Sequence, residues 1–375
     1  FSIILMIAGL LLYKHLPLWL GGEGDIARDA SRYAFIYVMM LPVMQLSRTG
    51  NGMLQSSGNT KAAGAIGVIV CVLDACFNYL LIFETRTVNL FGKLVTMPGA
   101  GLDVMGASLG TMLAEAVGMC IALYYLFFKN EMLRQRRSDF MYDKDKISKQ
   151  KHREEVLNTV RKELIKAIKI STPVAVEMII MNSAQIMITR IVVPLGAVSI
   201  AANSFAITAE GLCYMPGYGI SEAATTLVGQ SLGANRKEVA RKFAWMAVAL
   251  AGGTMSVLAV LMFIFAPQMM AVLSNDPEVI ALGAKVLRIE AFAELLYGVA
   301  IAGYGSCVGG GDTLIPSFMN FGSMWIIRIG LAAILTPRIG LAGYWIAMCI
   351  ELNVRGLLYI WRLRGEKWMK LKVIS

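Results

Sequence analysis

Long apolar segments alternate with short polar segments along the whole chain, and this pattern determines the predicted fold. A helix needs roughly 20 apolar residues to cross a bilayer. Nine stretches approach or exceed that length, and a shorter one precedes them. The predicted helices span 1–13, 26–47, 62–83, 102–128, 165–189, 198–228, 243–266, 279–303, 314–335 and 340–361. The chain is therefore predicted to be all-α, a polytopic membrane protein of ten helices with the first one partial.

A short glycine-containing motif occurs twice, with a constant offset of 253 positions. The first copy is Gly50-Asn51-Gly52 with Gly58-Asn59-Thr60, and the second is Gly303-Tyr304-Gly305 with Gly311-Asp312-Thr313. Six apolar stretches lie between the copies, so an even number of crossings gives both copies the same orientation. Parallel repeats of this kind build secondary transporters, with the substrate path between the halves. The repeat therefore predicts two pseudo-symmetric helical bundles.

One long polar segment, 129–164, separates the two predicted bundles. It mixes basic and acidic residues, which is typical of a solvated helix or linker. We expect an N-terminal bundle at 1–128, a linker at 129–164 and a C-terminal bundle at 165–375 with a short basic tail. Three predicted helices precede the second half's copy of helix 26–47, whereas only a partial helix precedes the first. The simplest interpretation is a fragment that lacks two helices and part of a third.

The charge distribution predicts the orientation in the membrane. Only 16% of the residues are charged and 57% are hydrophobic, whereas about a quarter of a soluble domain is charged. One set of alternate loops, which includes 129–169, carries 24 Lys and Arg, and the opposite set carries 5. The positive-inside rule places the first set in the cytoplasm. The net charge of +10 thus reports topology in the plasma (inner) membrane, and no nucleic-acid partner is expected.

The reactive residue types give no sign of an enzyme. All six cysteines lie in apolar segments without a C-x-x-C pair, and both histidines, His15 and His152, lie in loops. A metal centre or another cofactor is therefore not expected. The phosphate-binding Gly-x-x-x-x-Gly-Lys loop is missing from the sequence, which argues against direct use of ATP.

The most specific string in the chain is Ala223-Ala224-Thr225-Thr226-Leu227-Val228-Gly229-Gln230-Ser231-Leu232-Gly233-Ala234-Asn235-Arg236. It resembles the cytoplasmic loop signature of the MATE family, the multidrug and toxic compound extrusion transporters. The repeated glycine motifs are similar to that family too, as are three further strings. These are Met215-Pro216-Gly217-Tyr218-Gly219, Pro173-Val174-Ala175-Val176-Glu177 and Gly106-Ala107-Ser108-Leu109-Gly110-Thr111. The resemblance implies twelve helices in two six-helix bundles around a central cavity, of which this chain covers the third to the twelfth.

The glycine-rich family motifs are interpreted as structural turns rather than substrate contacts, because Gly and Asn favour tight turns. The residues concerned are Gly52, Gly58, Asn59, Thr60, Gly229, Gln230, Gly233, Ala234, Gly311, Asp312 and Thr313.

Polar side chains inside the first-half spans are candidates for ion coupling, because charges in a bilayer are costly and mark pathways by default. Asp74 and Asn78 are four residues apart on one predicted helix, and Thr111 and Glu115 are four apart on another. Each pair shares a helix face, and together they suit a proton or an oxygen-seeking cation such as Na⁺. A structural hydrogen-bond network is the alternative. Many members of the resembled family carry Asn-x-x-x-Asp where this chain has Asp74-x-x-x-Asn78.

In the second half the candidates are Glu177, Glu210, Glu290, Glu294 and Arg328. Some members of the resembled family carry a cation-site Glu deeper in the helix of Glu177, where this chain has Asn182. Arg288 is expected to neutralise Glu290, which leaves Glu294 as the better-buried acid. Arg328 is expected to pair with one of these acids.

Methionine is abundant, with 24 residues, and includes Met178 and Met181 on the helix of Glu177. Flexible Met side chains suit promiscuous binding, although contact with lipid or other helices is the commoner role.

The expected function is a cation-coupled antiporter, driven by H⁺ or Na⁺, that exports organic cationic or amphipathic compounds by alternating access. The expected partners are small organic substrates and the lipid bilayer, and a monomer is expected. A lipid-linked glycan flippase of related architecture is the rival transporter. An integral-membrane transferase, from a different class, would need clustered catalytic residues.

Overall fold

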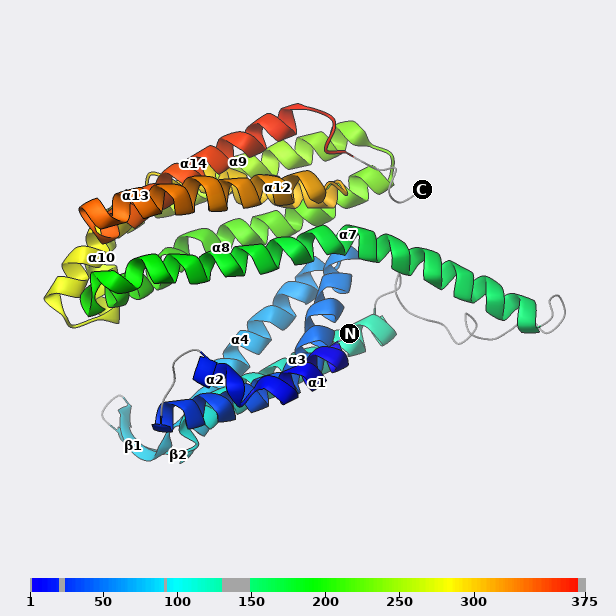
Figure 1. The fold of residues 1–375 in the computed structure, drawn as a ribbon. Coiled ribbons are helices and arrows are strands. Elements are labelled where there is room, and N and C mark those ends of the chain that lie inside the picture. The colour runs from blue at the N-terminus through cyan, green and yellow to red at the C-terminus, as the bar shows by residue number, and fades with distance from the viewer. Residues whose placement is uncertain (1, 20–23, 91–92, 130–148, 370–375) are drawn as a thin grey trace. The chain divides into compact units, whose positions relative to one another are not determined.

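The computed structural model describes residues 2–19, 24–90, 93–129 and 149–369, and it divides the chain into two units, Phe1–Lys146 and Ile147–Ser375 (Figure 1). Helices occupy every one of the ten predicted apolar ranges, which confirms the all-α fold class. Residues 130–148 of the predicted linker lie outside the described residues, and residues 149–164 form the start of a long helix, α7.

The N-terminal unit contains helices on either side of one β-hairpin. Its elements are α1 (Ser2–Leu12), α2 (His15–Trp19), α3 (Gly24–Ser56), α4 (Thr60–Ile82), β1 (Glu84–Leu90), β2 (Lys93–Ala100), α5 (Asp103–Tyr124) and the π-helix η1 (Tyr125–Lys129).

A β-hairpin lies between α4 and α5. Strands β1 and β2 pair antiparallel, with Val88 opposite Val95 and Thr87 opposite Thr96. These β-branched residues favour extended backbone. The hairpin thus connects the end of α4 to the start of α5.

Helix α5 packs closely against its neighbours through a stripe of small residues four positions apart. Gly106, Gly110, Ala114, Gly118 and Ala122 are all buried. A Cβ at Gly106 would lie 2.4 Å from the carbonyl oxygen of Leu81 on α4. Small residues at this spacing let membrane helices approach closely, so α5 holds α3 and α4 together.

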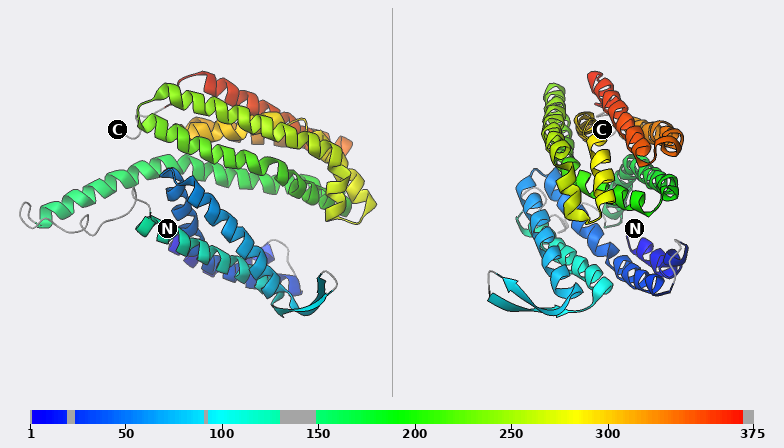
Figure 2. Two further views of the ribbon diagram at one scale, coloured as in Figure 1. Left: turned by 180° about the vertical axis from the view of Figure 1, so that it is seen from behind. Right: turned by 90° about the vertical axis from the view of Figure 1, so that its left-hand side faces the viewer.

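The C-terminal unit is a bundle of long helices that run side by side (Figures 1 and 2). Its elements are α7 (Lys149–Val192), the 3₁₀ turn η2 (Val193–Leu195), α8 (Ala197–Gly233), α9 (Lys237–Leu273), α10 (Pro277–Glu290), α11 (Glu294–Gly309), α12 (Leu314–Gly322), the π-helix η3 (Ser323–Ile329), α13 (Gly330–Ile339) and α14 (Leu341–Arg364).

Helix α11 lies in the interior of this unit, in contact with α8, α9 and α14. Most of its residues are buried, and many are Gly, Ala or Ser. A Cβ at Gly305 would lie 2.3 Å from the Ser221 Oγ on α8, and one at Gly303 would lie 2.8 Å from the Tyr359 Cβ on α14. The glycines therefore set the distances between α11 and its neighbours.

Six helical segments within the described residues are long and apolar enough to cross a membrane: Thr60–Ile82, Asp103–Lys129, Ala167–Leu195, Lys237–Leu273, Leu314–Ile339 and Leu341–Arg364. Outward-facing apolar side chains agree with this composition. Val272 is 85% exposed, Ile326 72% and Leu212 70%. An apolar surface of this kind suits contact with lipid.

Part of each family glycine motif lies inside a helix. Gly50, Asn51 and Gly52 lie inside α3, and Gly303 to Gly305 lie inside α11. Gly229 and Gln230 likewise lie inside α8. Gly52 and Gly229 were expected in turns. A Cβ at Gly229 would lie 3.4 Å from the Gly309 carbonyl oxygen on α11, whereas one at Gly52 would meet no atom within 4 Å.

The residues that follow form three helix ends of the same type. Gly58, Gly311 and Asn235 have positive φ angles of 87°, 77° and 59°. After α3, the Gly58 amide donates to the Gln55 carbonyl and the Asn59 amide to Leu54, each at 3.0 Å. Equivalent pairs of bonds close α11 and α8. This is the Schellman motif, in which Gly or Asn adopts the left-handed conformation, so the repeat encodes matching helix ends.

Candidate functional site

A cavity of about 500 Å³ lies in the C-terminal unit, between α7, α8 and α11. Its apolar and aromatic lining includes Met178, Met181, Tyr218, Tyr297 and Tyr304. Its polar lining includes Glu177, Asn182, Asn320 and Arg355. Concave sites of this size with a few fixed polar groups are typical of small-molecule binding.

Glu177 is held in place by donors from two other helices. It is buried, at 7% exposure. Its Oε1 accepts from the Asn320 Nδ2 at 2.6 Å, and its Oε2 accepts from the Ser317 Oγ at 2.6 Å. The Tyr304 hydroxyl also donates to Oε2, at 3.3 Å. Three donors therefore fix the orientation of the Glu177 carboxyl group at the edge of the cavity.

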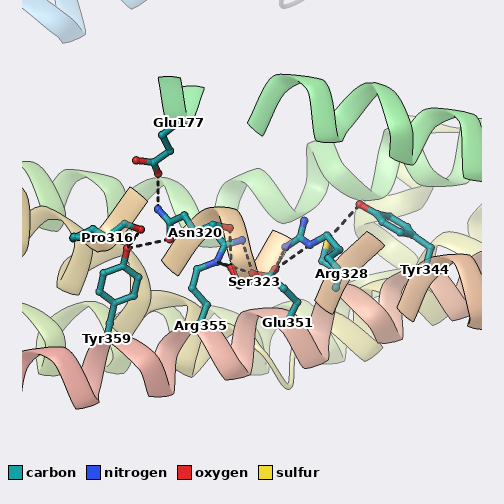
Figure 3. Close-up of polar contacts among 10 residues, drawn as sticks. Glu177, Pro316, Asn320, Ser323, Arg328, Tyr344, Glu351, Arg355 and Tyr359 are labelled. Atoms are coloured by element: carbon teal, nitrogen blue, oxygen red, sulfur yellow. Dashed lines mark hydrogen bonds and ion pairs between the residues drawn. The ribbon is translucent and has the colours of Figure 1, made fainter. Parts of the chain in front are cut away.

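Hydrogen bonds continue from Glu177 into the bundle (Figure 3). The Asn320 Oδ1 accepts from the Tyr359 hydroxyl at 3.0 Å. The Ser323 Oγ donates to the Asn320 carbonyl at 3.1 Å and accepts from the Arg355 Nε, also at 3.1 Å. Asn320, through its side-chain amide and its backbone carbonyl, and the Ser323 hydroxyl therefore link the cavity acid to Arg355.

Glu351 lies between two arginines at the inner end of this network (Figure 3). Its side chain is fully buried. Arg328 donates to Oε2 from Nε at 3.0 Å and from Nη2 at 2.6 Å, and Arg355 donates to Oε1 from Nε at 2.7 Å. Buried ion pairs are stable when such hydrogen bonds satisfy the charges. Arg328 thus pairs with Glu351, which was not among the acids predicted as its partners.

The π-helical segment η3 positions two members of the network. Ser323 begins η3, and Arg328 lies one residue before its end. A π turn inserts an extra residue into a helix and is frequent at functional sites. Here it interrupts the span Leu314–Ile339 at the level of Glu351.

A second pocket, of about 320 Å³, lies in the N-terminal unit. Asp74, Thr111 and Glu115 line it, together with Ser47, Arg48 and Asn51. The structure therefore brings three of the four predicted first-half residues together. Asn78 is not part of this lining, and its Oδ1 faces Gly110, where a Cβ would lie 2.3 Å away.

The remaining second-half candidates have different environments. Asn182 lines the cavity, and its Nδ2 donates to the Met178 carbonyl at 2.7 Å. Glu290 and Glu294 are both fully buried. Arg288 does not neutralise Glu290 as expected, because its Nε donates to the Phe263 carbonyl at 3.2 Å and its guanidinium lies near the Phe263 ring.

The sequence reasoning missed the partners of Glu177 and the acid at the centre of the arginine pair. Asn320 lies within the predicted span 314–335, and Glu351 and Arg355 lie within 340–361. Each interrupts an apolar stretch, and the i, i+4 spacing of Glu351 and Arg355 indicates a pair on one helix face. This spacing is the feature of the sequence that could have identified Glu351 and Arg355 as an ion pair.

Comparison with known proteins identifies the family. The family model MatE matches residues 1–80 and 173–334. The chain is 27% identical over 359 residues to the "Probable multidrug resistance protein NorM" of Thermotoga maritima, with 94% of this chain and 70% of that protein covered. It is 25% identical over 374 residues to the "Uncharacterized transporter YisQ" of Bacillus subtilis, with 99% and 76% covered.

Solved structures share the fold. A MOP superfamily transporter from Pyrococcus furiosus matches with a TM-score of 0.81 at 19% identity, over 99% of this chain and 76% of that one. A structure of MATE in the bent conformation matches with a TM-score of 0.77 at 18% identity, over 100% and 77%. With the family model matching well over half of its length, the chain belongs to the MatE family of MATE transporters and is a multi-pass membrane protein.

Proposed function

We propose that the protein exports small organic cations, and that a cation gradient drives the export. The lining of the C-terminal cavity carries this proposal. Two carboxylates, Glu177 and Glu222, line a space that is also bordered by Met178, Met181 and tyrosine rings. Aromatic faces attract organic cations, and flexible Met side chains adapt to different shapes.

The relatives support export of more than one compound. The NorM protein of Thermotoga maritima and the MdtK protein of Yersinia pestis are both named as multidrug resistance proteins. Promiscuous binders use adaptable, Met-rich surfaces rather than many fixed hydrogen bonds. The cavity has this character, because Met178, Met181 and three tyrosine rings border it beside the hydrogen-bonded carboxylate of Glu177.

The N-terminal pocket is proposed as the coupling site, with Asp74 and Glu115 as the groups that take H⁺ or Na⁺. Both carboxyl groups line that pocket with the Thr111 hydroxyl and Asn51. A coupling ion drives alternating access when it binds one conformation more tightly than the other.

Efflux measurements on cells that express the complete gene test this function. Cells loaded with the fluorescent cation ethidium are followed while Na⁺ and pH are varied independently. Efflux that depends on either ion gradient is expected, and Glu177→Gln should slow it at least several-fold because the counter-charge is lost. Glu278→Gln, at the exposed start of α10, is the matched control. Ethidium efflux that ignores both gradients, or that survives Glu177→Gln unchanged, would disprove the proposal.

A further inference from the structure

Three buried acids of the C-terminal unit lie outside the cavity and the network of Glu177. Glu210 is on α8, Glu290 is the last residue of α10, and Glu294 is the first residue of α11. Glu210 is 5% exposed, and the other two are fully buried. Helix α8 packs against both α10 and α11, and the charge of Glu210 acts on Glu290 and Glu294, so the three side chains form one group.

Among the residues that the structure describes, two of these acids find no hydrogen-bond partner for their carboxyl oxygens. Within the described part of the chain, neither oxygen of Glu290 and neither oxygen of Glu294 accepts or donates a hydrogen bond. Buried polar groups in proteins are almost always hydrogen-bonded. An ionised carboxylate in such surroundings is strongly disfavoured, which points to a ligand that removes the charge.

The elements packed against the three acids supply little neutralising charge. Helix α9 carries its ionisable residues, Lys237, Glu238, Arg241 and Lys242, only in its first two turns. The groups whose charges or dipoles act on the acids or lie beside them are Tyr214 and Cys213 of α8, Tyr297 of α11, Arg328 of η3, and Tyr344, Cys349 and Glu351 of α14. Arg328 is the one group in this set that carries a positive charge.

The arginines balance only part of the negative charge. Arg328 and Arg355 both contact Glu351, and Glu351 neutralises one of the two guanidinium groups. A single positive charge is then left to face Glu210, Glu290 and Glu294. If all three were ionised, two uncompensated negative charges would lie inside a membrane bundle, where such charges are costly.

We propose that Glu210, Glu290 and Glu294 form a proton-binding site in the interior of the C-terminal bundle, and that at least two of the three carry a proton in this conformation. A proton removes the charge without requiring further ligands. A metal cation would need several oxygen ligands and would be repelled by the guanidinium of Arg328, whose charge acts on Glu290 and Glu210.

The position of the acids connects the site to movement of the bundle. Glu290 ends α10 and Glu294 begins α11, and residues 291–293 form a turn between them. A change in the angle between the two helices changes the separation of the carboxyl groups, and therefore how many protons they hold. This use of the protons rests on the proposed transport function, whereas the existence of the site does not.

Infrared difference spectroscopy tests the site without measuring transport. The full-length protein in lipid nanodiscs is titrated from acid to alkaline pH, in H₂O and again in D₂O. We expect the absorption band of protonated carboxyl groups, shifted by D₂O, and a loss of most of that band in the Glu290→Gln, Glu294→Gln double variant. The single variant Glu294→Gln should lose a smaller share, and it decides the question if the double variant fails to fold.

Glu238→Gln, in the exposed first turn of α9, is the control that should keep the band. An unchanged band in the folded double variant, or in Glu294→Gln if only that variant folds, would overturn the site. So would loss of the wild-type band on adding Na⁺ at constant pH, which would assign the acids to a metal cation. A protein with the expected band but without ethidium efflux would retain this site and lose only the proposed function.

Discussion

Glu351 and Glu290 are both fully buried, yet only Glu351 is surrounded by donors. Two arginines fix the charge of Glu351, so that carboxylate has a structural position between α14 and η3. Asp74 is less buried than either of these acids, and its Oδ1, like the oxygens of Glu290, has no hydrogen-bond partner in the described residues. A carboxyl group without fixed donors is free to exchange an ion, which is the property that a coupling residue needs.

Asp74→Asn should remove the dependence of efflux on the ion gradient while leaving the protein folded. An amide has nearly the volume of a carboxylate, so packing is retained and only the exchangeable charge is lost. Ethidium efflux under varied Na⁺ and pH provides the measurement. Asp276→Asn is the control, because Asn caps a helix as well as Asp does and Asp276 caps α10. Unchanged ion dependence in Asp74→Asn, with Glu115→Gln also silent, would remove the N-terminal pocket from the coupling mechanism.

Gly305→Ala should destabilise the C-terminal bundle. The new Cβ would lie 2.3 Å from the Ser221 Oγ and 2.5 Å from the Ser221 carbonyl oxygen, so α8 and α11 would have to separate. Overpacking of this kind costs about 1–3 kcal/mol. Thermal unfolding of the detergent-solubilised protein should show a lower midpoint. Gly322→Ala is the control, because a Cβ there meets no atom within 4 Å and Ala favours helix. Equal midpoints for the two variants would contradict the proposed contact.

The candidate site was predictable only where a single residue carries the signal. Glu177 and Asp74 are acids inside apolar stretches, and the sequence alone singles them out. Their partners are not local, because Asn320 lies 143 positions after Glu177 and no periodic pattern relates the two. The interior position of Glu290 also depends on contacts between helices, so Arg288, two positions away, was wrongly expected to neutralise it.

At the scale of elements, the repeat at an offset of 253 positions encodes two matching helix ends. Gly58 ends α3 and Gly311 ends α11, both with positive φ and with the same pair of capping hydrogen bonds. The residues that follow these two glycines, Asn59 and Asp312, have different roles. The Asn59 Oδ1 accepts from the Ala62 amide, whereas Asp312 is bound by Arg362 at 3.0 Å from Nε. Asp312 thus replaces the Asn of the first copy because it binds Arg362.

Gly311→Ala should destabilise the end of α11 by about 1–2 kcal/mol, because a left-handed backbone places Cβ too close to the following carbonyl. Gly311→Asn should be milder, since Asn tolerates this conformation, as Asn235 does with a φ of 59°. The thermal unfolding midpoints of the wild type and the two variants, measured in one detergent, rank their stabilities. A midpoint for the Ala variant at or above that of the Asn variant would rule out backbone strain as the cause.

The apolar pattern predicted the existence and order of the helices because bilayer thickness fixes the length of each apolar run. Helix ends were less predictable. Glycines in 50–52 and 229–233 look like turn residues, but within α3 and α8 they serve close packing or face open space. The hairpin Glu84–Ala100 was missed because its alternation is short and it follows an apolar helix.

At the scale of the molecule, the orientation of the chain in the membrane remains a prediction from the loop charges. Cysteine at position 148, introduced as Ser148→Cys in a cysteine-free background, should resist an impermeant thiol reagent added to intact cells. Asn275→Cys, in the exposed turn between α9 and α10, should react. In inside-out vesicles the labelling should be reversed, so that the cysteine at position 148 reacts and the cysteine at position 275 does not. Labelling of Ser148→Cys from outside intact cells would reverse the predicted topology.

The segment η3 is wound as a π-helix and carries one more residue than α-helical turns over the same length. Successive residues of an α-helix are about 100° apart around its axis. If the extra residue passed along the helix into α13, the side chains of Ser323–Ile329 would turn by about that angle while both ends of the span stayed in place. The guanidinium of Arg328 would then swing away from Glu351. A local slip in winding would thus expose or shield a charge without displacing any whole helix.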